Sequence, residues 1–308
     1  MRIVRHPVAP ATPCAVAIGS FDGVHRGHAA LLAGLREAAR ARGIAVAVLT
    51  FEPLPREFFA AAAAPARLSS LGERLAELAR LDVDIAFTQR FDARFAALGA
   101  AEFEEYLRHR IGARLVVVGR DFRYGSGRSG DVARLARRGG ELGFEVQVVE
   151  DVAEGGERVS STRVRQALAA GDFDAARRLL GRPYAICGRV VHGSKRGRLM
   201  GFPTANVRLA RPRAALAGIY AVKCFGAATR GLEGVASLGT NPAVDSSGRA
   251  TLEAFLFDFS GDLYGARISI EFVKKLRDEA HFASLGALAA QIGRDCEAAR
   301  EFFRERTR

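Results

Sequence analysis

The pattern of apolar residues changes at one point along the 308-residue chain, and this change constrains the fold more than any other feature. Before that point, continuous apolar runs alternate with amphipathic helical stretches. The runs predict strands at 15–19, 44–51, 85–87, 115–119 and 145–149, and the stretches predict helices at 27–42, 71–81, 100–111, 131–142, 164–169 and 172–180. Apolar strands separated by helices are typical of a parallel sheet covered on both faces. We therefore expect an N-terminal α/β domain of Rossmann-like type.

The change falls at a breaker cluster, Gly181-Arg182-Pro183. Beyond it, apolar runs follow one another through Gly, Pro and Ser loops, with no helical pattern between them. They predict strands at 184–191, 218–225, 232–238, 251–257 and 267–272, and a closing amphipathic helix at 285–304. Strands in that arrangement indicate an antiparallel β-barrel. The predicted domains are residues 1–183 and 184–308, and two domains also suit a chain of this length.

Composition narrows the class of protein. With 49% hydrophobic residues the chain is globular rather than disordered. No apolar run reaches the roughly 18 residues that a membrane span needs, and residues 1–13 are broken by prolines at 7, 10 and 13, unlike a secretory signal. The cysteines at 14, 187, 224 and 296 lack metal-ligand spacing. We therefore expect a cytoplasmic protein that does not enter the membrane.

The formal net charge of +12 comes mostly from arginine and suits anionic partners. The basic residues form neither a block nor an alternation with aromatic residues, as an RNA or DNA binder would show. We therefore expect small phosphorylated partners and no nucleic acid. A general bias toward Gly, Ala and Arg explains the excess charge equally well. The sequence predicts no particular oligomeric state.

The densest motif, GSFDGVHRGH at 19–28, lies between the first predicted strand and the first predicted helix. Ligands bind at the carboxyl ends of strands in open α/β sheets, and a helix N-terminus there presents N–H groups to phosphate. His25 and His28 lie three apart and can stabilise charge that develops at the α-phosphate of a nucleotide. The nucleotide-binding candidates around these two catalytic candidates are Gly19, Phe21, Asp22 and Gly23. The alternatives are a Gly-rich turn with incidental histidines, or a zinc pair that lacks a third ligand.

A second phosphate-binding candidate, RVSSTRVR at 158–165, follows the last predicted strand and opens a helix. Hydroxyls at a helix start, flanked by arginines, can clamp a phosphate. The residues singled out are Arg158, Ser161 and Thr162. An ordinary N-cap among surface arginines is the alternative, and it is weakened because both motifs fall at strand-to-helix junctions of one predicted sheet.

The HRGH motif at 25–28 together with SST at 160–162 resembles the paired signature of the nucleotidyltransferase superfamily. TFEP at 50–53 and VGRDFRYG at 118–125 narrow the resemblance to the FMN adenylyltransferase half of the bacterial bifunctional riboflavin kinase/FAD synthetase family. Leu54 departs from that family, which often has histidine there. The resemblance implies that His25 and His28 contact ATP phosphates and that Asp121 helps hold a substrate. It also implies that Arg158, Ser161 and Thr162 close on the leaving pyrophosphate as FMN attacks the α-phosphorus.

The second half opens with GRVVHGSKRGR at 188–198, followed by LMGFPTAN at 199–206. The glycine spacing predicts a basic loop that covers phosphates, although it is not a Walker loop. The nucleotide-binding candidates are Gly188, Gly193 and Arg198. Thr204 and Asn206 add neutral oxygens that can bind nucleotide and ligate Mg²⁺. A Gly-rich hairpin after a proline turn is the alternative.

Glu253 interrupts an apolar strand and shares one face of it with Phe255 and Phe257. A lone carboxylate among aromatic residues is either a general base at a barrel mouth or a charge at a strand end. The segment resembles the riboflavin kinase half of the same family, through PTAN at 203–206, GTNP at 239–242 and FVKKLR at 272–277. Ala243 departs from the threonine usual in the family.

By this resemblance, Glu253 deprotonates the riboflavin 5′-hydroxyl, and Thr204 and Asn206 hold Mg²⁺–ATP. The resemblance also implies that Arg277 lies near the flavin or the phosphate. The predicted function is phosphorylation of riboflavin to FMN and then adenylylation of FMN to FAD, with ATP as the second substrate of both steps. One alternative is an adenylyltransferase for another small phosphate or nucleotide precursor, which would leave the second half unexplained. The other is a basic RNA-binding or flavin-sensing protein without turnover.

Overall fold

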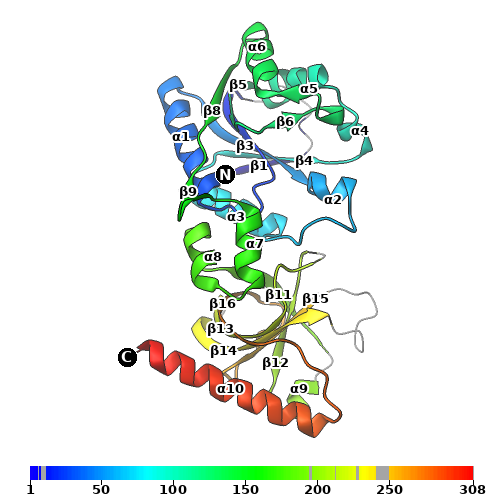
Figure 1. Cartoon of the computed structure of the whole chain (residues 1–308), viewed down its shortest axis with the longest axis vertical. Helices are drawn as coiled ribbons and strands as arrows, with labels where there is room; N and C mark the ends of the chain where they lie inside the picture. Colours follow the sequence, from blue (N-terminus) through cyan, green and yellow to red (C-terminus); the bar gives the residue numbers. More distant parts are fainter. Residues whose placement is uncertain are drawn as a thin grey trace. The chain divides into compact units, whose positions relative to one another are not determined.

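The structure is a computed structural model and describes residues 1–5, 7, 12–193, 196–211, 213–226, 229–240 and 250–307. The chain forms two compact units (Figure 1). The first comprises Met1–Pro65 and Leu71–Ser160, and the second comprises Ala66–Ser70 and Ser161–Arg308. No described helix is both long enough and apolar enough to cross a bilayer.

The first unit is built on a six-stranded parallel sheet in the order β1-β4-β3-β2-β5-β8. Its strands are β1 (Arg2–Arg5), β2 (Cys14–Ile18), β3 (Ala45–Glu52), β4 (Ile85–Arg90), β5 (Ala113–Gly119) and β8 (Glu145–Val149). The predicted parallel sheet is confirmed. The additional strand is β1, which pairs with β4 from Arg2 opposite Ile85.

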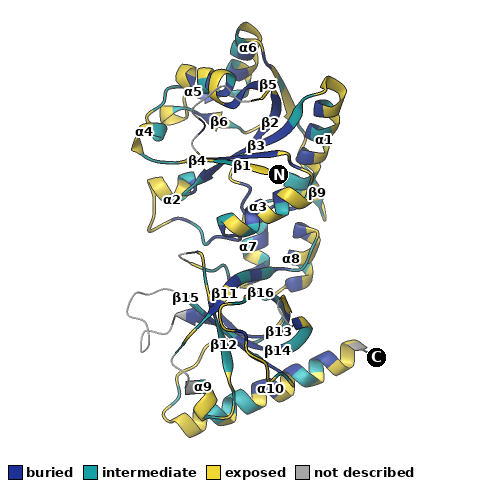
Figure 2. Cartoon of the chain, turned by 180° about the vertical axis from the view of Figure 1, so that it is seen from behind, coloured by how far each residue is buried: buried dark blue, intermediate teal, exposed yellow. Residues whose placement is uncertain are grey.

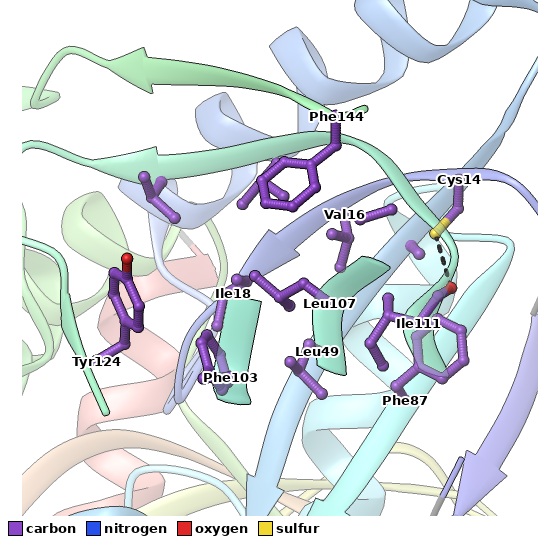
Figure 3. Close-up of a cluster of buried hydrophobic side chains, with 14 of the residues drawn as sticks. Cys14, Val16, Ile18, Leu49, Phe87, Phe103, Leu107, Ile111, Tyr124 and Phe144 are labelled. Atoms are coloured by element: carbon purple, nitrogen blue, oxygen red, sulfur yellow. Dashed lines mark hydrogen bonds between the residues drawn. The ribbon is translucent and has the colours of Figure 1, made fainter. Parts of the chain in front are cut away.

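Helices cover both faces of this sheet. One face packs against α1 (Arg26–Arg42) and α3 (Leu71–Arg80). The other packs against α5 (Ala100–Tyr106), the π-helical turn Leu107–Ile111 and α6 (Val132–Leu142). Alternate residues of β2 serve the two cores, and Figure 3 shows Cys14, Val16 and Ile18 within the second one. Because both of their faces are buried, the central strands β2 and β3 are largely apolar, as the sequence indicates, whereas the edge strands β1 and β8 are partly exposed.

Short elements connect these layers. They are α2 (Pro55–Phe59), α4 (Ala93–Ala96), β6 (Arg123–Tyr124), the 3₁₀ turn Ser126–Arg128, β7 (Gly130–Asp131), β9 (Ala153–Glu154) and β10 (Glu157–Arg158). Strands β6 and β7 pair as one hairpin, and β9 and β10 pair as another.

The second unit contains a closed antiparallel barrel in the order β11-β12-β15-β14-β13-β16, which confirms the predicted barrel. Its strands are β11 (Ala185–Val191), β12 (Thr204–Arg208), β13 (Gly218–Gly226), β14 (Thr229–Thr240), β15 (Ala250–Leu256) and β16 (Arg267–Arg277). The sequence analysis does not predict β12. The short helix α9 (Arg196–Leu199) precedes it.

Three helices complete the second unit: α7 (Ser161–Ala169), α8 (Phe173–Leu180) and α10 (Leu285–Thr307). In α10, Cys296, Ala299 and Phe303 pack on apolar barrel residues, whereas much of the opposite side of the helix is exposed (Figure 2). From α8, Phe173 places its ring 5.8 Å from that of Tyr220 and 6.4 Å from that of Phe272. The compact unit thus begins at Ser161, whereas the predicted domain boundary lies after residue 183.

Candidate functional site

His25 and His28 form a reciprocal cap at the start of α1. The N–H of His28 donates to Nδ1 of His25, and the N–H of His25 donates to Nδ1 of His28, both at 3.3 Å. The two rings stack with their centroids 3.7 Å apart. A Cβ at Gly27 would lie 3.2 Å from the His25 ring, so the glycine permits this close approach. The two predicted catalytic histidines are therefore held together at a helix N-terminus, where the dipole favours an anion.

The turn between β2 and α1 has an unusual backbone. Phe21, Gly23 and Val24 have φ values of 49°, 82° and 42°. Residues other than glycine rarely adopt positive φ values, and they keep them only where the surrounding structure holds the backbone in place. Phe21 and Val24 are buried, as is Asp22, and the Phe21 ring lies 4.9 Å from that of His28. The Phe21 ring also packs against Gly19, where a Cβ would meet it at 3.3 Å.

Arg74 of α3 supports the same turn, and the sequence analysis missed it. Its side chain is 1% exposed and donates to the carbonyl oxygen of Ser20 at 2.7 Å and to Oγ1 of Thr50 at 3.1 Å. It also forms an ion pair with Glu52 at 2.9 Å. Arg74 therefore joins the carboxyl ends of β2 and β3. The sequence feature that could have indicated its burial is its position three residues after Leu71 and four before Leu78, on the apolar face of α3.

Arg158, predicted to close on the leaving pyrophosphate, and Asp121, predicted to help hold a substrate, lie together. Nη1 of Arg158 is 2.7 Å from Oδ2 of Asp121, and its Nε is 3.0 Å from Oδ1 of Asp151. Ser161 and Thr162 open α7, as predicted, and belong to the second unit. Their contact with pyrophosphate stays a prediction.

An aromatic pocket of about 640 Å³ lies in the first unit, and the sequence analysis missed it. Its aromatic lining consists of Phe51, Phe59, Phe91, Phe95, Phe103, Phe122 and Tyr124. Arg56, Arg123 and Arg128 add positive charge. Concave apolar pockets with a few charged groups are the usual sites for aromatic ligands with a polar tail. The available signal was the phenylalanines that end or follow the central strands, such as Phe51 and Phe91.

A buried carboxylate fixes one wall of this aromatic pocket. Glu104 is 0% exposed and accepts hydrogen bonds from the hydroxyl of Tyr124 at 2.6 Å and from Nε of Arg134 at 2.7 Å. Burial alone would raise the pKa of Glu104, but the hydrogen bonds from Arg134, Tyr124 and Arg138 lower it below its usual value. The Tyr124 ring is thus held by its hydroxyl group, which donates to Glu104, and by a tilted contact with the Phe103 ring.

In the barrel, the structure brings together the predicted base and the predicted Mg²⁺ ligands. Oγ1 of Thr204 donates to Oε2 of Glu253 at 3.2 Å. Asn206 lies directly opposite Glu253 in the register of β12 and β15, so the three side chains share one face. A Cβ at Gly193 would collide with the Asn206 amide, which explains the glycine there.

Two pockets meet at Thr204. The first, of about 550 Å³, is also lined by Arg198, Ala254 and Tyr264. The second, of about 530 Å³, is also lined by Glu253, Phe255 and Arg277. Because neighbouring residues of a strand point to opposite faces, the pockets lie on the two sides of β15. Such an arrangement suits two ligands that react where their pockets join.

The other predicted residues of the barrel have definite places. Arg277 makes a two-pronged ion pair with Asp295 of α10, at 2.9 and 2.7 Å. Gly188 packs under Arg208 and is not among the lining residues of these two pockets. Asn241, Pro242 and Ala243 lie outside the described residues. The sequence analysis missed Glu279, which lines the second pocket and whose pKa is raised by burial.

The residues around Thr204 fit a magnesium ion that arrives with a nucleotide. Within the described ranges, no group of three or more His, Cys, Asp and Glu side chains could hold a metal by itself. Thr204, Asn206 and Glu253 instead offer a few oxygen donors on one face. Mg²⁺ is commonly bound by one or two protein oxygens, with phosphates and water supplying the rest.

Comparisons with known proteins match both halves. The family described as FAD synthetase matches residues 8–163, and the family described as riboflavin kinase matches residues 180–303. The bifunctional riboflavin kinase/FMN adenylyltransferase of Escherichia coli (strain K12) is 50% identical over 296 residues, which cover 96% of this chain and 94% of that protein. The protein of the same description from Pseudomonas fluorescens is 47% identical, with 97% of each chain covered.

Among solved structures, a Streptococcus pneumoniae protein described as a macrolide-efflux protein has the same fold. Its TM-score is 0.78 at 30% identity, covering 97% of this chain and 99% of that one. The matched families, the long and close similarity to the two bacterial enzymes, and the order of the two domains agree with one another. The chain therefore belongs to the bifunctional riboflavin kinase/FMN adenylyltransferase family, with an FAD synthetase domain followed by a riboflavin kinase domain.

Proposed function

We propose that the chain phosphorylates riboflavin to FMN in the barrel and adenylylates FMN to FAD in the α/β unit, with Mg²⁺–ATP as the second substrate of both reactions. The observation that carries this proposal is the junction at Thr204, where two pockets meet beside the half-buried carboxylate of Glu253. The aromatic pocket of the other unit would supply a separate site for the second reaction.

In the kinase reaction, ATP occupies the pocket that Arg198 lines and riboflavin occupies the pocket that Phe255 lines. The riboflavin 5′-hydroxyl then lies beside Glu253. Its oxygen attacks the γ-phosphorus, the bond to ADP breaks, and Glu253 accepts the hydroxyl proton. Thr204 and Asn206 would hold Mg²⁺, which would supply positive charge to neutralise the phosphates. Arg277, fixed by Asp295, helps to shape the end of the pocket that holds the flavin ring.

In the adenylyl transfer, the flavin ring of FMN enters the aromatic pocket and its phosphate reaches the turn before α1. A phosphate oxygen attacks the α-phosphorus of ATP and pyrophosphate leaves. His25 and His28 stabilise the charge that develops, because the reciprocal cap already holds them in place. Gly19, Phe21, Asp22 and Gly23 shape the turn that receives the nucleotide. Arg158, Ser161 and Thr162 bind the leaving pyrophosphate, and Asp121 orients Arg158 through their ion pair.

We also propose that the functional domains are residues 1–183 and 184–308, a division that the ranges of the two matched families support. Cytoplasmic action is part of this proposal because both reactions consume ATP. We expect small-molecule partners rather than nucleic acid, since arginines such as Arg26, Arg134 and Arg300 are already paired with carboxylates.

The test is to incubate the purified chain with ATP and Mg²⁺ and either riboflavin or FMN, and then separate the flavins. Riboflavin should yield FMN and then FAD, and FMN should yield FAD directly. Removing Mg²⁺ with a chelator should stop both reactions. Formation of FMN without FAD would contradict the adenylyltransferase assignment, and formation of FAD from FMN only would contradict the kinase assignment.

A further inference from the structure

A charged side chain is buried beneath the turn that presents the histidines. Arg74 lies near the start of α3 and is 1% exposed. Its neighbours on that helix, Leu75 and Leu78, belong to the same apolar core as Phe21 and Val24 of the turn. Burying an arginine costs free energy, and apolar side chains in place of a buried ion pair often leave a protein equally stable or more stable. Packing alone therefore does not account for an arginine at this position.

The guanidinium of Arg74 binds oxygen atoms from two segments that lie side by side at one end of the sheet. Nη1 donates to the carbonyl oxygen of Ser20 at 2.7 Å and to Oγ1 of Thr50 at 3.1 Å. Nη2 donates to Oε2 of Glu52 at 2.9 Å. Oγ1 of Thr50 in turn donates to the carbonyl oxygen of Ser20 at 3.3 Å. That carbonyl oxygen is thus held by two side chains, one from α3 and one from β3.

The two segments differ in how firmly the fold holds their backbone. On one side, β3 is a central strand that pairs with both β2 and β4. On the other side, the turn after Ser20 lies between β2 and α1 and has φ values of 49° at Phe21 and 42° at Val24. Conformations of that kind persist only where the surrounding structure holds them. Arg74 therefore ties the less constrained segment to the more constrained one.

Both segments lead into the adenylyl transfer site. The ring of Phe21 lies 4.9 Å from that of His28, and the turn ends at His25, the N-cap of α1. On β3, Phe51 lies between the two residues that Arg74 contacts, and it lines the aromatic pocket. The arginine thus fixes the distance between the pocket proposed for the flavin and the two histidines. A displacement of about 1 Å between reacting groups can cost roughly 10²-fold in rate.

We propose that Arg74 is a positioning residue for FMN adenylylation, because it holds the turn of His25 and His28 against the end of β3 through the carbonyl oxygen of Ser20. The inference rests on the proposed function, since it takes this turn as the place where the α-phosphorus of ATP reacts. It also gives a role to the first and third residues of the TFEP motif at 50–53. All of these residues belong to the first compact unit.

The test compares the steady-state constants of FMN adenylylation in Arg74→Met and in the unmodified full-length chain. The substitution keeps an unbranched side chain in the core but removes the donors, and Glu52 stays in contact with water because its side chain is 34% exposed. We expect kcat to fall about 10²-fold. KM for FMN should change by less than about twofold, because the lining of the aromatic pocket is kept.

Two further variants serve as controls for this change. Arg74→Lys retains the charge but not the forked geometry of the guanidinium, so it should recover part of the lost kcat. Arg80→Ala removes an arginine side chain of the same helix that is 74% exposed, and it should change neither constant.

If Arg74→Met does not fold, Thr50→Val carries the test with a smaller disturbance. It keeps the shape of the side chain and removes the hydroxyl that donates to Ser20, so kcat should fall about fivefold, the size of effect of one neutral hydrogen bond. Thr50→Ser keeps the hydroxyl and should retain the kcat of the unmodified chain. Equal kcat values in Thr50→Val and Thr50→Ser would overturn the inference.

Binding of FMN without ATP distinguishes positioning from a loss of folded protein. Titration followed by flavin fluorescence should give the same stoichiometry for each variant as for the unmodified chain, and riboflavin phosphorylation should be unchanged. An unchanged kcat of adenylylation in Arg74→Met, or a fall matched by an equal loss of FMN binding, would overturn the inference. Failure of the unmodified chain to make FAD from FMN would instead overturn the proposed function, so the two failures are distinguishable.

Discussion

Replacing Glu253 by glutamine should stop the chain at its first reaction. The carboxylate lies 3.2 Å from Oγ1 of Thr204, at the point where the two barrel pockets join. Glutamine has almost the same volume and can still form a hydrogen bond with Thr204. It cannot accept the proton of the riboflavin hydroxyl at neutral pH. Binding should therefore survive while turnover fails.

The size of the effect follows from the role proposed for Glu253. A positioned general base contributes roughly 10²- to 10⁴-fold to a rate, which corresponds to about 3–5 kcal/mol in the activation free energy at 25 °C. Because phosphoryl transfer has a loose transition state in most analyses, the proton leaves late and the lower end of this range is expected. KM for riboflavin should change little, since the pocket lining keeps its shape.

The assay measures FMN formed from riboflavin and FAD formed from FMN by the same preparation of Glu253→Gln. The second rate should equal that of the unmodified chain, because adenylylation uses the other unit. Glu233→Gln is the matched control: this glutamate is on β14 of the same barrel, is paired with Lys223 at 3.7 Å and is not among the residues that line the kinase pockets. Near-normal FMN formation by Glu253→Gln would refute the general-base role.

Three further predictions address the other parts of the molecule. His28→Ala should slow FAD formation from FMN by about 10²-fold or more and leave riboflavin phosphorylation intact in a flavin assay; equal loss of both would contradict separate sites. Residues 184–308 should phosphorylate riboflavin alone, but their free energy of unfolding in urea should be about 3–5 kcal/mol lower than that of residues 161–308, because the shorter fragment loses Phe173 from the barrel core; equal free energies of unfolding would contradict this. Since the pKa of Glu104 is lowered in the folded chain, its stabilising contribution is present above the unfolded carboxyl pKa of about 4.3 and is lost as pH falls below it. The unmodified chain and Glu104→Gln should therefore differ less in their free energy of unfolding, measured by chemical denaturation, as the pH is lowered. A difference that does not change with pH would contradict the ion pairing.

The layers of the fold could be predicted because burial leaves a direct pattern in the sequence. The central strands β2 and β3 of the parallel sheet are buried on both faces and are therefore largely apolar. The sequence analysis missed β1 and β12. In β12 only Ala205 and Val207 are apolar, because the face that carries Thr204 and Asn206 lines the site rather than a core. Thr204 and Asn206, which made β12 difficult to recognise in the sequence, are therefore the residues assigned to the site.

The candidate site could be predicted where its residues are local in sequence and not where they are distant. His25 and His28 are brought together by one helical turn, so spacing alone indicated their proximity. Arg74 reaches the same turn from a separate helix, and its charge gave no reason to expect burial. The packing of residues 66–70 in the second unit depends on Arg211, far along the chain. No local pattern encodes such a contact.

Complementation between two variants tests the central claim, that one chain carries two independent active sites. Glu253→Gln and His28→Ala are each incubated with riboflavin, ATP and Mg²⁺, separately and then mixed. Glu253→Gln alone should leave riboflavin unchanged, and His28→Ala alone should stop at FMN. The mixture should make FAD, because FMN released by one variant is the substrate of the other. FAD formation from riboflavin by either folded variant alone, at the rate of the unmodified chain, would contradict the assignment of the two reactions to these two sites.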